Sequence, residues 1–258
     1  MDYFKVVVEE KIATVTLNRP PANALSKSVL AELDQVLIEL ERNDDVHVLL
    51  LHGEGRFFAA GADIKEFTEA LNGAEFAQNA RHGQQLFRRM EDFAKPIIVA
   101  IHGAALGGGL ELAMSCHIRL TTEDAKLGLP ELSLGLIPGF AGSQRLPRFV
   151  GTAKAAEMML TSDPISGAEA KAIGLVNSTF ATEAELLEES RKLAKKIAAK
   201  SRVSVKRTLE LLRYSRNPQQ DAGSSKEAEL FGEVFDSVDG KEGIQAFIEK
   251  RSPNFKNK

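Results

Sequence analysis

The sequence predicts an α/β fold followed by a helical C-terminal region. Up to about Val176, short β-branched or apolar runs alternate with segments in which apolar residues recur at helical spacing. This alternation is typical of α/β proteins with largely buried strands. Beyond Thr182 the spacing is helical throughout. No repeat or linker separates independent domains, so we expect a core over residues 1–195 and a helical oligomerisation region over residues 196–258.

Two strands and a helix are predicted at the N-terminus. Phe4–Val8 and Ile12–Leu17 are β-branched runs separated by three charged residues, which favours a hairpin. Ser26 is a suitable helix N-cap after the loop that precedes it. The apolar residues that follow Ser26 recur at three- and four-residue steps and predict an amphipathic helix; they are Val29, Leu30, Leu33, Val36, Leu37 and Leu40.

The middle of the chain is predicted to continue the alternation of strands and helices. The expected elements are a strand at Val46–Leu51, a glycine-rich loop at Gly53–Gly61, helices at Ile64–Leu71 and Ala74–Phe93, a strand at Ile97–Ile101, a turn at Gly103–Gly107 and a helix at Gly108–Ser115. Each glycine-rich segment therefore follows a strand and opens a helix.

The C-terminal region is predicted to contain helices alone. They span Thr182–Lys200, Ser201–Tyr214, Gln219–Ser237 and Lys241–Lys250. Beyond Ser201 their apolar faces exceed what one small core covers, and large exposed apolar patches usually mark an interface. We therefore expect a trimer or a hexamer.

Composition excludes several classes of partner. The 33 basic and 36 acidic residues give a net charge of −3, which argues against a polyanionic partner such as nucleic acid. The single cysteine, Cys116, excludes an intrachain disulfide and fits a reducing compartment. The N-terminus lacks the pattern of a signal peptide. The longest uncharged apolar stretch, Pro96–Leu110, is too short for a membrane span. We expect a cytoplasmic protein with no membrane partner.

Two glycine-rich segments are candidates for an anion-binding site. Phe57–Lys65 and His102–Glu111 each place small residues before a predicted helix, where backbone N–H groups are free and negative charge is favoured. One such loop is equally well explained as a tight turn. Two of them favour an oxyanion site, which needs two donors on one oxygen. Neither segment has the spacing of a phosphate-binding loop or a dinucleotide fingerprint.

Two glutamates stand in apolar surroundings. Glu111 lies three residues after Gly108 and shares its face if a helix begins there. Glu131 follows Leu129-Pro130 and precedes a long uncharged run. An arbitrary glutamate is more often a surface carboxylate or a helix cap, since glutamate is almost never buried unpaired. In apolar surroundings, however, a carboxyl group acquires the raised pKa that suits general acid–base catalysis near neutral pH.

Several short motifs occur in the order found in the crotonase (enoyl-CoA hydratase/isomerase) family, which the chain resembles over nearly its whole length. They are Asn18-Arg19-Pro20 with Asn23-Ala24-Leu25, Ala60-Gly61-Ala62-Asp63-Ile64-Lys65, Ala105-Leu106-Gly107-Gly108-Gly109-Leu110-Glu111, Pro130-Glu131, Gly135-Leu136-Ile137-Pro138-Gly139 and Gln144-Arg145-Leu146. No one of these motifs is decisive. Their common register makes a coincidence very improbable.

The resemblance implies a spiral of ββα turns, followed by C-terminal helices that mediate trimers and, by stacking, hexamers. It assigns the thioester oxygen to the backbone N–H groups of Ala62 and Gly108. It also matches Glu111 and Glu131 to the two acids of the enoyl-CoA hydratases. Glu111 would deprotonate the water that attacks C3, Glu131 would supply the proton to C2, and Gly139 would lie close to this water. No metal or redox cofactor is implied, because coenzyme A is part of the substrate.

The resemblance also implies a site for the coenzyme A body. The matching residues are Ala22, Ala60, Ala62, Asp63, Ile64, Lys65 and Gly108 from one subunit, with Phe247 and Lys250 from a neighbouring subunit. The chain departs from the family pattern in two places. The loop over residues 18–25 is one residue shorter, with Pro21 where lysine is common. Phe140 replaces a small residue and is expected to narrow the acyl pocket.

Two other functions remain open from the sequence. One is a different activity of the same family, such as enoyl-CoA isomerase or a hydratase for branched acyl groups. The product formed from crotonyl-CoA distinguishes these. The other is a non-catalytic RNA-binding or scaffold protein. The net charge of −3, the two tyrosines and the lack of tryptophan argue against base stacking, and the two retained acids argue against a silent protein.

Overall fold

The computed structural model describes residues 1–258 except 64–65, 67–72, 215–236 and 257–258. A six-stranded sheet has the order β1-β2-β3-β4-β6-β9, in which β1 is antiparallel to β2 and the other pairs are parallel. Its strands are β1 (Phe4–Glu9), β2 (Ile12–Leu17), β3 (Val48–Gly53), β4 (Ile97–Ile101), β6 (Ile118–Thr122) and β9 (Ser178–Phe180). A smaller sheet contains β5 (Ala104–Leu106), β7 (Lys126–Gly128) and β8 (Ile165–Ser166).

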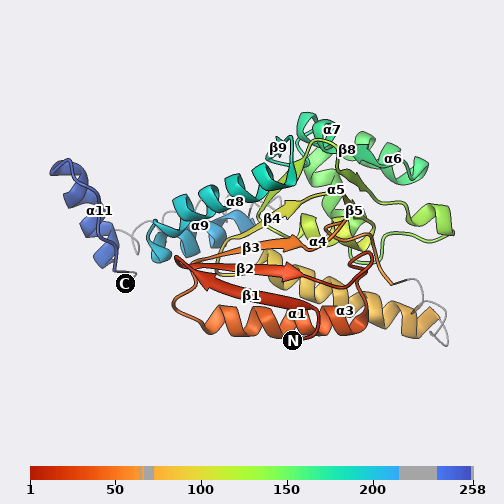
Figure 1. The fold of residues 1–258 in the computed structure, drawn as a ribbon, viewed down its shortest axis with the longest axis horizontal. Coiled ribbons are helices and arrows are strands. Elements are labelled where there is room, and N and C mark those ends of the chain that lie inside the picture. Colours follow the sequence, from red (N-terminus) through yellow and green to blue (C-terminus); the bar gives the residue numbers. More distant parts are fainter. Residues whose placement is uncertain (64–65, 67–72, 215–236, 257–258) are drawn as a thin grey trace.

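Helices cover both faces of the large sheet (Figure 1). They are α1 (Lys27–Arg42), α3 (Gly73–Glu91), α4 (Gly108–Met114), the short 3-10 helix η1 (Glu131–Leu134), α5 (Gly142–Val150), α6 (Thr152–Thr161), α7 (Gly167–Ala172), α8 (Glu183–Ala198), α9 (Arg202–Tyr214) and α11 (Val238–Ile248). The predicted α/β fold with C-terminal helices is confirmed.

The N-terminal elements form as predicted. The hairpin pairs Phe4 with Leu17 and Glu9 with Ile12. Ser26 caps α1, because its side chain accepts a hydrogen bond of 3.2 Å from the N–H of Val29. This bond satisfies one of the amides that have no partner within the helix.

Both faces of β3 are buried, which explains its continuous apolar sequence. Leu49 and Leu51 belong to the core shared with α1 and α3. Val48 and Leu50, on the other face, belong to the core covered by α8. The alternation follows from the two-residue period of a strand.

Some predicted boundaries were wrong. The strand expected at Val46–Leu51 begins two residues later, at Val48. The segment expected to be only a turn, Gly103–Gly107, contains β5, which pairs with β7. The helices expected at Ile64–Leu71 and Gln219–Ser237 lie outside the described residues, apart from isolated positions. The expected division between residues 195 and 196 falls inside α8 and stays a prediction.

The C-terminal helix α11 projects from the body of the molecule beyond α8 and α9 (Figure 1). Its first turn is held by a buried hydrogen bond of 2.7 Å from the Ser201 hydroxyl to Asp239. In the part of the chain that the structure describes, every helix is too short or too polar to cross a bilayer.

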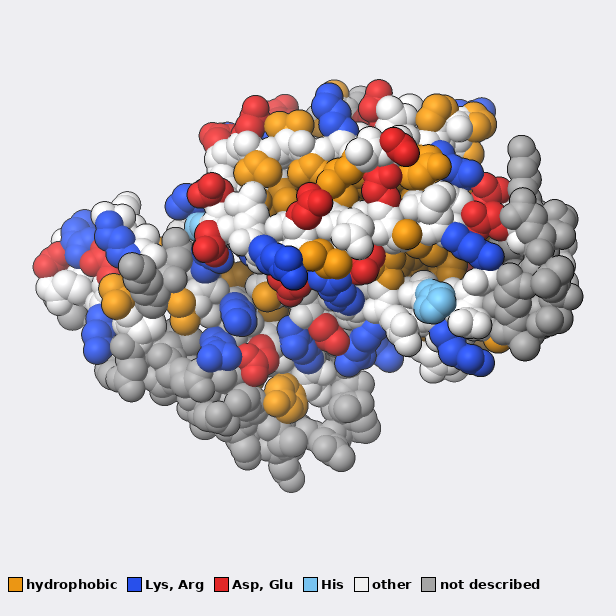
Figure 2. All heavy atoms as spheres, turned by 90° about the horizontal axis from the view of Figure 1, so that it is seen from below, with side chains coloured by type: hydrophobic (Ala, Val, Ile, Leu, Met, Phe, Trp, Pro, Cys, Tyr) orange, Lys and Arg blue, Asp and Glu red, His pale blue; other side chains and the backbone are white. Residues whose placement is uncertain are grey.

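The face below α1 in Figure 1 carries acidic and basic side chains side by side (Figure 2). Arg89 of α3 bridges two acids of α1, with nitrogen–oxygen distances of 2.7 Å to Asp34 and 2.9 Å to Glu41. These pairs tie α3 to α1 at the outside of the core. Neither sign of charge dominates this face, which agrees with the small net charge.

Candidate active site

A cavity of about 100 Å³ lies between α1, α3, the start of α4 and the segment around η1. It is lined by Leu25, Lys27, Leu30, Ala62, Glu66, Asn79, Ala80, Gly108, Glu111, Glu131, Leu136, Ile137, Gly139 and Phe140. The five residues predicted to be catalytic are among them. The structure therefore brings together the two glycine-rich segments and the two acids from distant parts of the chain.

Two backbone N–H groups, those of Ala62 and Gly108, lie close together at this cavity. The neighbouring amides are engaged: Leu25 donates to Gly61, Asp63 donates to Leu25 at 3.0 Å, and Gly107 donates to Gly128 at 2.9 Å. Within the described residues, the N–H groups of Ala62 and Gly108 donate to no backbone carbonyl. A methyl group added at Gly108 would lie 3.5 Å from the Ala62 nitrogen. The two amides are thus close enough to share one acceptor oxygen.

Glycine is required where α4 begins. Gly107 has a φ of 49°, and a Cβ there would lie 3.0 Å from Oε1 of Glu131. A Cβ at Gly109 would lie 2.1 Å from the carbonyl oxygen of Ala59. The glycine run therefore lets the start of α4 pack directly on the first glycine-rich segment.

Glu111 is a buried carboxyl group held by one of its oxygens. Its side chain is in α4 and the residue is 1% exposed. Its Oε1 accepts hydrogen bonds from the N–H groups of Phe140, at 2.8 Å, and Gly142, at 2.6 Å. Burial and the nearby charge of Glu131 raise the pKa of Glu111 to about 7, against the lowering effect of these N–H groups and of Arg145. Near neutral pH, Glu111 can therefore exchange a proton.

Glu131 begins η1 and faces the same cavity. Its Oε2 is buried and has no hydrogen-bond partner among the described residues. Burial raises the pKa of Glu131 above its ordinary value. A buried carboxyl oxygen without a protein partner is available to a ligand or a water molecule in the cavity.

Two polar side chains to which the sequence analysis gave no role, Gln84 and Arg145, hold the segment over residues 139–142. Gln84 of α3 donates a hydrogen bond of 2.8 Å to the carbonyl oxygen of Gly139. Arg145 donates to the carbonyl oxygen of Phe140 and forms a buried ion pair of 2.9 Å with Glu91. Arg145 belongs to the motif Gln144-Arg145-Leu146, but this motif did not predict that its side chain bonds to the segment beside the cavity. Gln84 carried no sequence pattern that distinguishes it from a solvated helix residue.

The residues expected to hold coenzyme A are only partly brought together. Ala60 donates a hydrogen bond of 3.0 Å to the carbonyl oxygen of Ala22, so these two lie side by side. Asp63 forms an ion pair of 2.5 Å with Arg19. Ile64 and Lys65 lie outside the described residues, as does the side chain of Phe247.

Phe247 and Lys250 lie near the C-terminus, far in the sequence from the residues that line the cavity. Phe247 belongs to α11, and Lys250 follows this helix. Lys250 is not among the described residues that line the cavity of this chain. A role for Lys250 at the cavity would therefore require another subunit.

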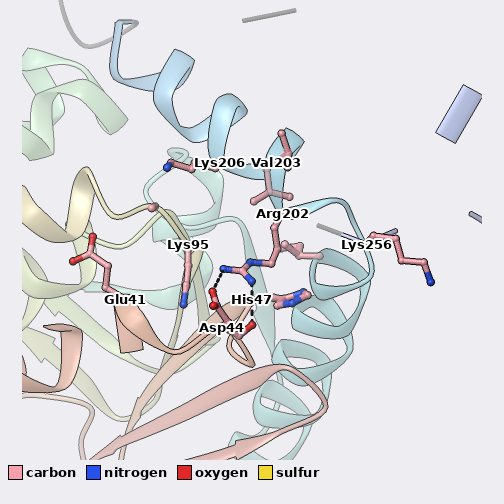
Figure 3. Close-up of a pocket in the computed structure, with 11 residues that line it drawn as sticks. Glu41, Asp44, His47, Lys95, Arg202, Val203, Lys206 and Lys256 are labelled. Carbon is pink, nitrogen blue, oxygen red and sulfur yellow. Dashed lines mark hydrogen bonds and ion pairs between the residues drawn. The ribbon is translucent and has the colours of Figure 1, made fainter. Parts of the chain in front are cut away.

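A second, larger cavity of about 560 Å³ lies near the C-terminal ends of α1 and α8 (Figure 3). Its two acids are ion-paired at 2.9 Å each, Glu41 with Arg89 and Asp44 with Arg202. Lys95 donates to the carbonyl oxygens of Leu40 and Asn43 at 2.6 Å, which caps the end of α1. Both acids of this cavity and the Lys95 ammonium group are thus already bonded to other groups of the protein.

Lys95 gives a prediction for stability against pH. Burial lowers the pKa of Lys95 from 10.5 to about 8. The charged form of Lys95 is therefore less favourable in the folded state than in the unfolded state, and below pH of about 8 this difference lowers the stability. The loss of stability disappears as pH rises from about 8 to about 10.5, because the folded protein is then neutral at Lys95 while the unfolded chain is still charged. We expect the unfolding free energy of the wild type, relative to that of Lys95→Met, to rise by roughly 3 kcal/mol over this range. Urea denaturation at several pH values measures it, and a flat difference contradicts it.

Comparison with known proteins shows the family to which the chain belongs. The family model "Enoyl-CoA hydratase/isomerase" matches residues 8–258. A Bacillus subtilis protein named "Probable enoyl-CoA hydratase" is 56% identical over 99% of both chains. The "Short-chain-enoyl-CoA hydratase" of Clostridium acetobutylicum is 41% identical over 100% of both chains. The crystal structure of an enoyl-CoA hydratase from Bacillus anthracis has a TM-score of 0.93 at 34% identity and covers 99% of this chain and 100% of that one. The predicted resemblance is confirmed, and the chain belongs to the enoyl-CoA hydratase/isomerase family.

Proposed function

We propose that this protein is an enoyl-CoA hydratase, which adds water reversibly to a trans-2-enoyl-CoA and gives a 3-hydroxyacyl-CoA. The observation that carries the proposal is the meeting of two acids of raised pKa, Glu111 and Glu131, with two free amides in one cavity. Relatives named as hydratases over the full length support the same activity.

The two amides act on the thioester. As water adds to C3, negative charge moves through C2 to the carbonyl oxygen, which becomes enolate-like. The N–H groups of Ala62 and Gly108 donate to this oxygen and stabilise the charge as it develops. They lie close together, and backbone hydrogen bonds hold the neighbouring residues Asp63 and Gly107, so the two donors are in place before the charge develops.

The two acids act on the water. Oε1 of Glu111 is occupied by two N–H groups, which leaves Oε2 to accept a proton from the water as its oxygen bonds to C3. Oε2 of Glu131 has no partner among the described residues. Glu131, whose pKa is raised by burial, would supply the proton that C2 receives. Gly139, whose carbonyl is held by Gln84, lines the cavity beside them. Proton exchange with solvent then restores both acids.

The raised pKa of Glu111 predicts how the rate depends on pH. Glu111 must be ionised to accept a proton, and its pKa is about 7. We expect kcat/KM for crotonyl-CoA to fall about tenfold per pH unit below this value. Because Glu111 and Glu131 interact, the measured pKa belongs to the pair. The pH profile of kcat/KM checks this, and a flat profile down to pH of about 5 contradicts the assignment of Glu111 as the base.

The coenzyme A site is proposed to span two subunits. Ala22, Ala60 and Asp63, with Ile64 and Lys65, would line the nucleotide from one subunit. The adjacency of Ala22 and Ala60 supports this. Phe247 and Lys250 would come from a neighbouring subunit, since α11 projects from its own (Figure 1).

This arrangement predicts the oligomeric state. A trimer or hexamer is expected by light scattering at micromolar concentration. A truncated chain that ends at Tyr214 should lose both the assembly and most of its affinity for the substrate. A monomeric mass for the full chain would contradict a shared coenzyme A site.

Turnover of two substrates tests the proposed activity against the isomerase alternative. A hydratase converts crotonyl-CoA to 3-hydroxybutyryl-CoA, whereas an isomerase moves the double bond of a trans-3-enoyl-CoA without adding water. We expect crotonyl-CoA to be the better substrate by kcat/KM. Isomerisation without hydration, or binding without turnover, would overturn the proposal.

A further inference from the structure

The side chain of Phe140 fits a notch between α3 and the start of α4. A Cβ added at Gly83 of α3 would lie 2.4 Å from Cδ1 and Cε1 of the ring, and one added at Gly108 would lie 3.2 Å from Cε2. The ring also meets Phe87 edge to face, with centroids 5.4 Å apart. The notch exists because residue 83 has no side chain, and a larger residue there would displace the ring.

The backbone of Phe140 is fixed where the ring meets the cavity. Its N–H group donates to Glu111 at 2.8 Å, and its carbonyl oxygen accepts a hydrogen bond from Arg145. Gln84 holds the preceding carbonyl, that of Gly139. Because the backbone is held by these hydrogen bonds and the ring packs against α3 and α4, rotation of the ring to admit a larger ligand would disrupt this packing.

The ring limits the space that is left for an acyl chain. Ala80 of α3 lines the cavity one turn before Gly83, and Phe87 lies one turn after it. A chain that runs along α3 from the reacting carbons would therefore meet Phe140 after a short distance. The cavity volume of about 100 Å³ is smaller than the roughly 150 Å³ of a cavity that holds benzene. The ring therefore takes up space that an acyl chain would otherwise occupy at this end of the cavity.

We propose that Phe140, held in the notch at Gly83, is the specificity-determining residue that restricts this enzyme to short-chain enoyl-CoA substrates. The inference rests on the proposed hydratase function and adds the side chain that closes the acyl pocket. Removal of the ring would join the cavity to the space in front of Phe87, along the small residues of α3.

The first test compares two substrates in two variants. For each enzyme, kcat/KM is measured with crotonyl-CoA and with trans-2-decenoyl-CoA. The value for decenoyl-CoA is then divided by the value for crotonyl-CoA. Phe140→Ala should raise this ratio at least about tenfold, since even one methylene group in a fitted apolar pocket is worth that much. Phe149→Ala is the matched control. The centroid of the Phe149 ring lies 4.1 Å from Cζ of Arg119, and Phe149 is not among the described residues that line the cavity. The ratio of the two kcat/KM values should therefore be the same in Phe149→Ala as in the wild type.

The second test asks whether Gly83 provides the notch. Gly83→Ala in the wild-type background forces a methyl group against the ring and should lower both the melting temperature and crotonyl-CoA turnover. In the Phe140→Ala background the same change should raise the melting temperature, because alanine stabilises the interior of a helix relative to glycine. The sign of the effect should thus reverse between the two backgrounds.

The outcomes separate this inference from the proposed function. A wild-type enzyme without hydratase activity overturns the proposed function itself. A wild-type hydratase whose ratio of long to short substrate is unchanged by Phe140→Ala overturns only the role of Phe140. An equal effect of Gly83→Ala in both backgrounds overturns the notch.

Discussion

Replacement of Glu111 or Glu131 by glutamine lowers kcat for crotonyl-CoA by at least about 10²-fold in each variant. In both variants the amide keeps the volume of the side chain. At residue 111 its oxygen can still accept hydrogen bonds from the N–H groups of Phe140 and Gly142. It can neither take a proton from water nor give one to C2. We therefore expect KM to change much less than kcat. Steady-state kinetics with crotonyl-CoA measure both constants.

The thermal stability of Glu111→Gln serves as the control for folding. Folding raises the pKa of Glu111 from 4.5 to about 7, so stability is lost as pH rises from about 4.5 to about 7 and the ionised carboxylate remains unfavourable above that range. Above pH of about 8, the glutamine variant should melt no lower than the wild type. A folded variant of either acid with near-normal turnover would remove that acid from the mechanism.

The oxyanion hole is tested by Gly108→Pro, because proline has no N–H group. Gly108 is the first residue of α4, a position where proline is tolerated. The developing enolate would lose one of its two donors, which typically costs about 10²–10³ in kcat. Hydration and any isomerase side activity should fall together, since both pass through the same charged oxygen.

Gly108→Ala is the matched control for this variant. A Cβ at residue 108 would lie 3.2 Å from the Phe140 ring, so proline adds crowding as well as removing the donor. Alanine adds the same Cβ and keeps the N–H group. We expect the alanine variant to retain far more activity than the proline variant. Circular dichroism confirms that both are folded, and a folded Gly108→Pro enzyme of ordinary activity would place the oxyanion hole elsewhere.

Local chemistry explains which elements could be predicted from the sequence. The Ser26 cap and the β1–β2 hairpin depend on residues close together in the chain, and both form as expected. The placement of Gly108 and Glu111 at one cavity also follows from their spacing on a helix. In such segments the local pattern and the tertiary structure require the same conformation.

Non-local contacts explain what could not be predicted. The strand β5 consists of three residues and exists because β7 pairs with it, from more than twenty positions away in the chain. Nothing within Gly103–Gly107 indicates that partner. Likewise, Gln84 and Arg145 became part of the site only because the fold brings α3 and α5 to the segment over residues 139–142.

The product formed from crotonyl-CoA in water enriched in heavy oxygen tests the central claim most directly. Glu111, Glu131 and the amides of Ala62 and Gly108 are proposed to add water across the double bond. Mass spectrometry should then find 3-hydroxybutyryl-CoA, heavier than the substrate by one water, with the heavy oxygen on C3. A product of unchanged mass, or heavy oxygen in a freed carboxylate after thioester cleavage, would contradict hydration at this site.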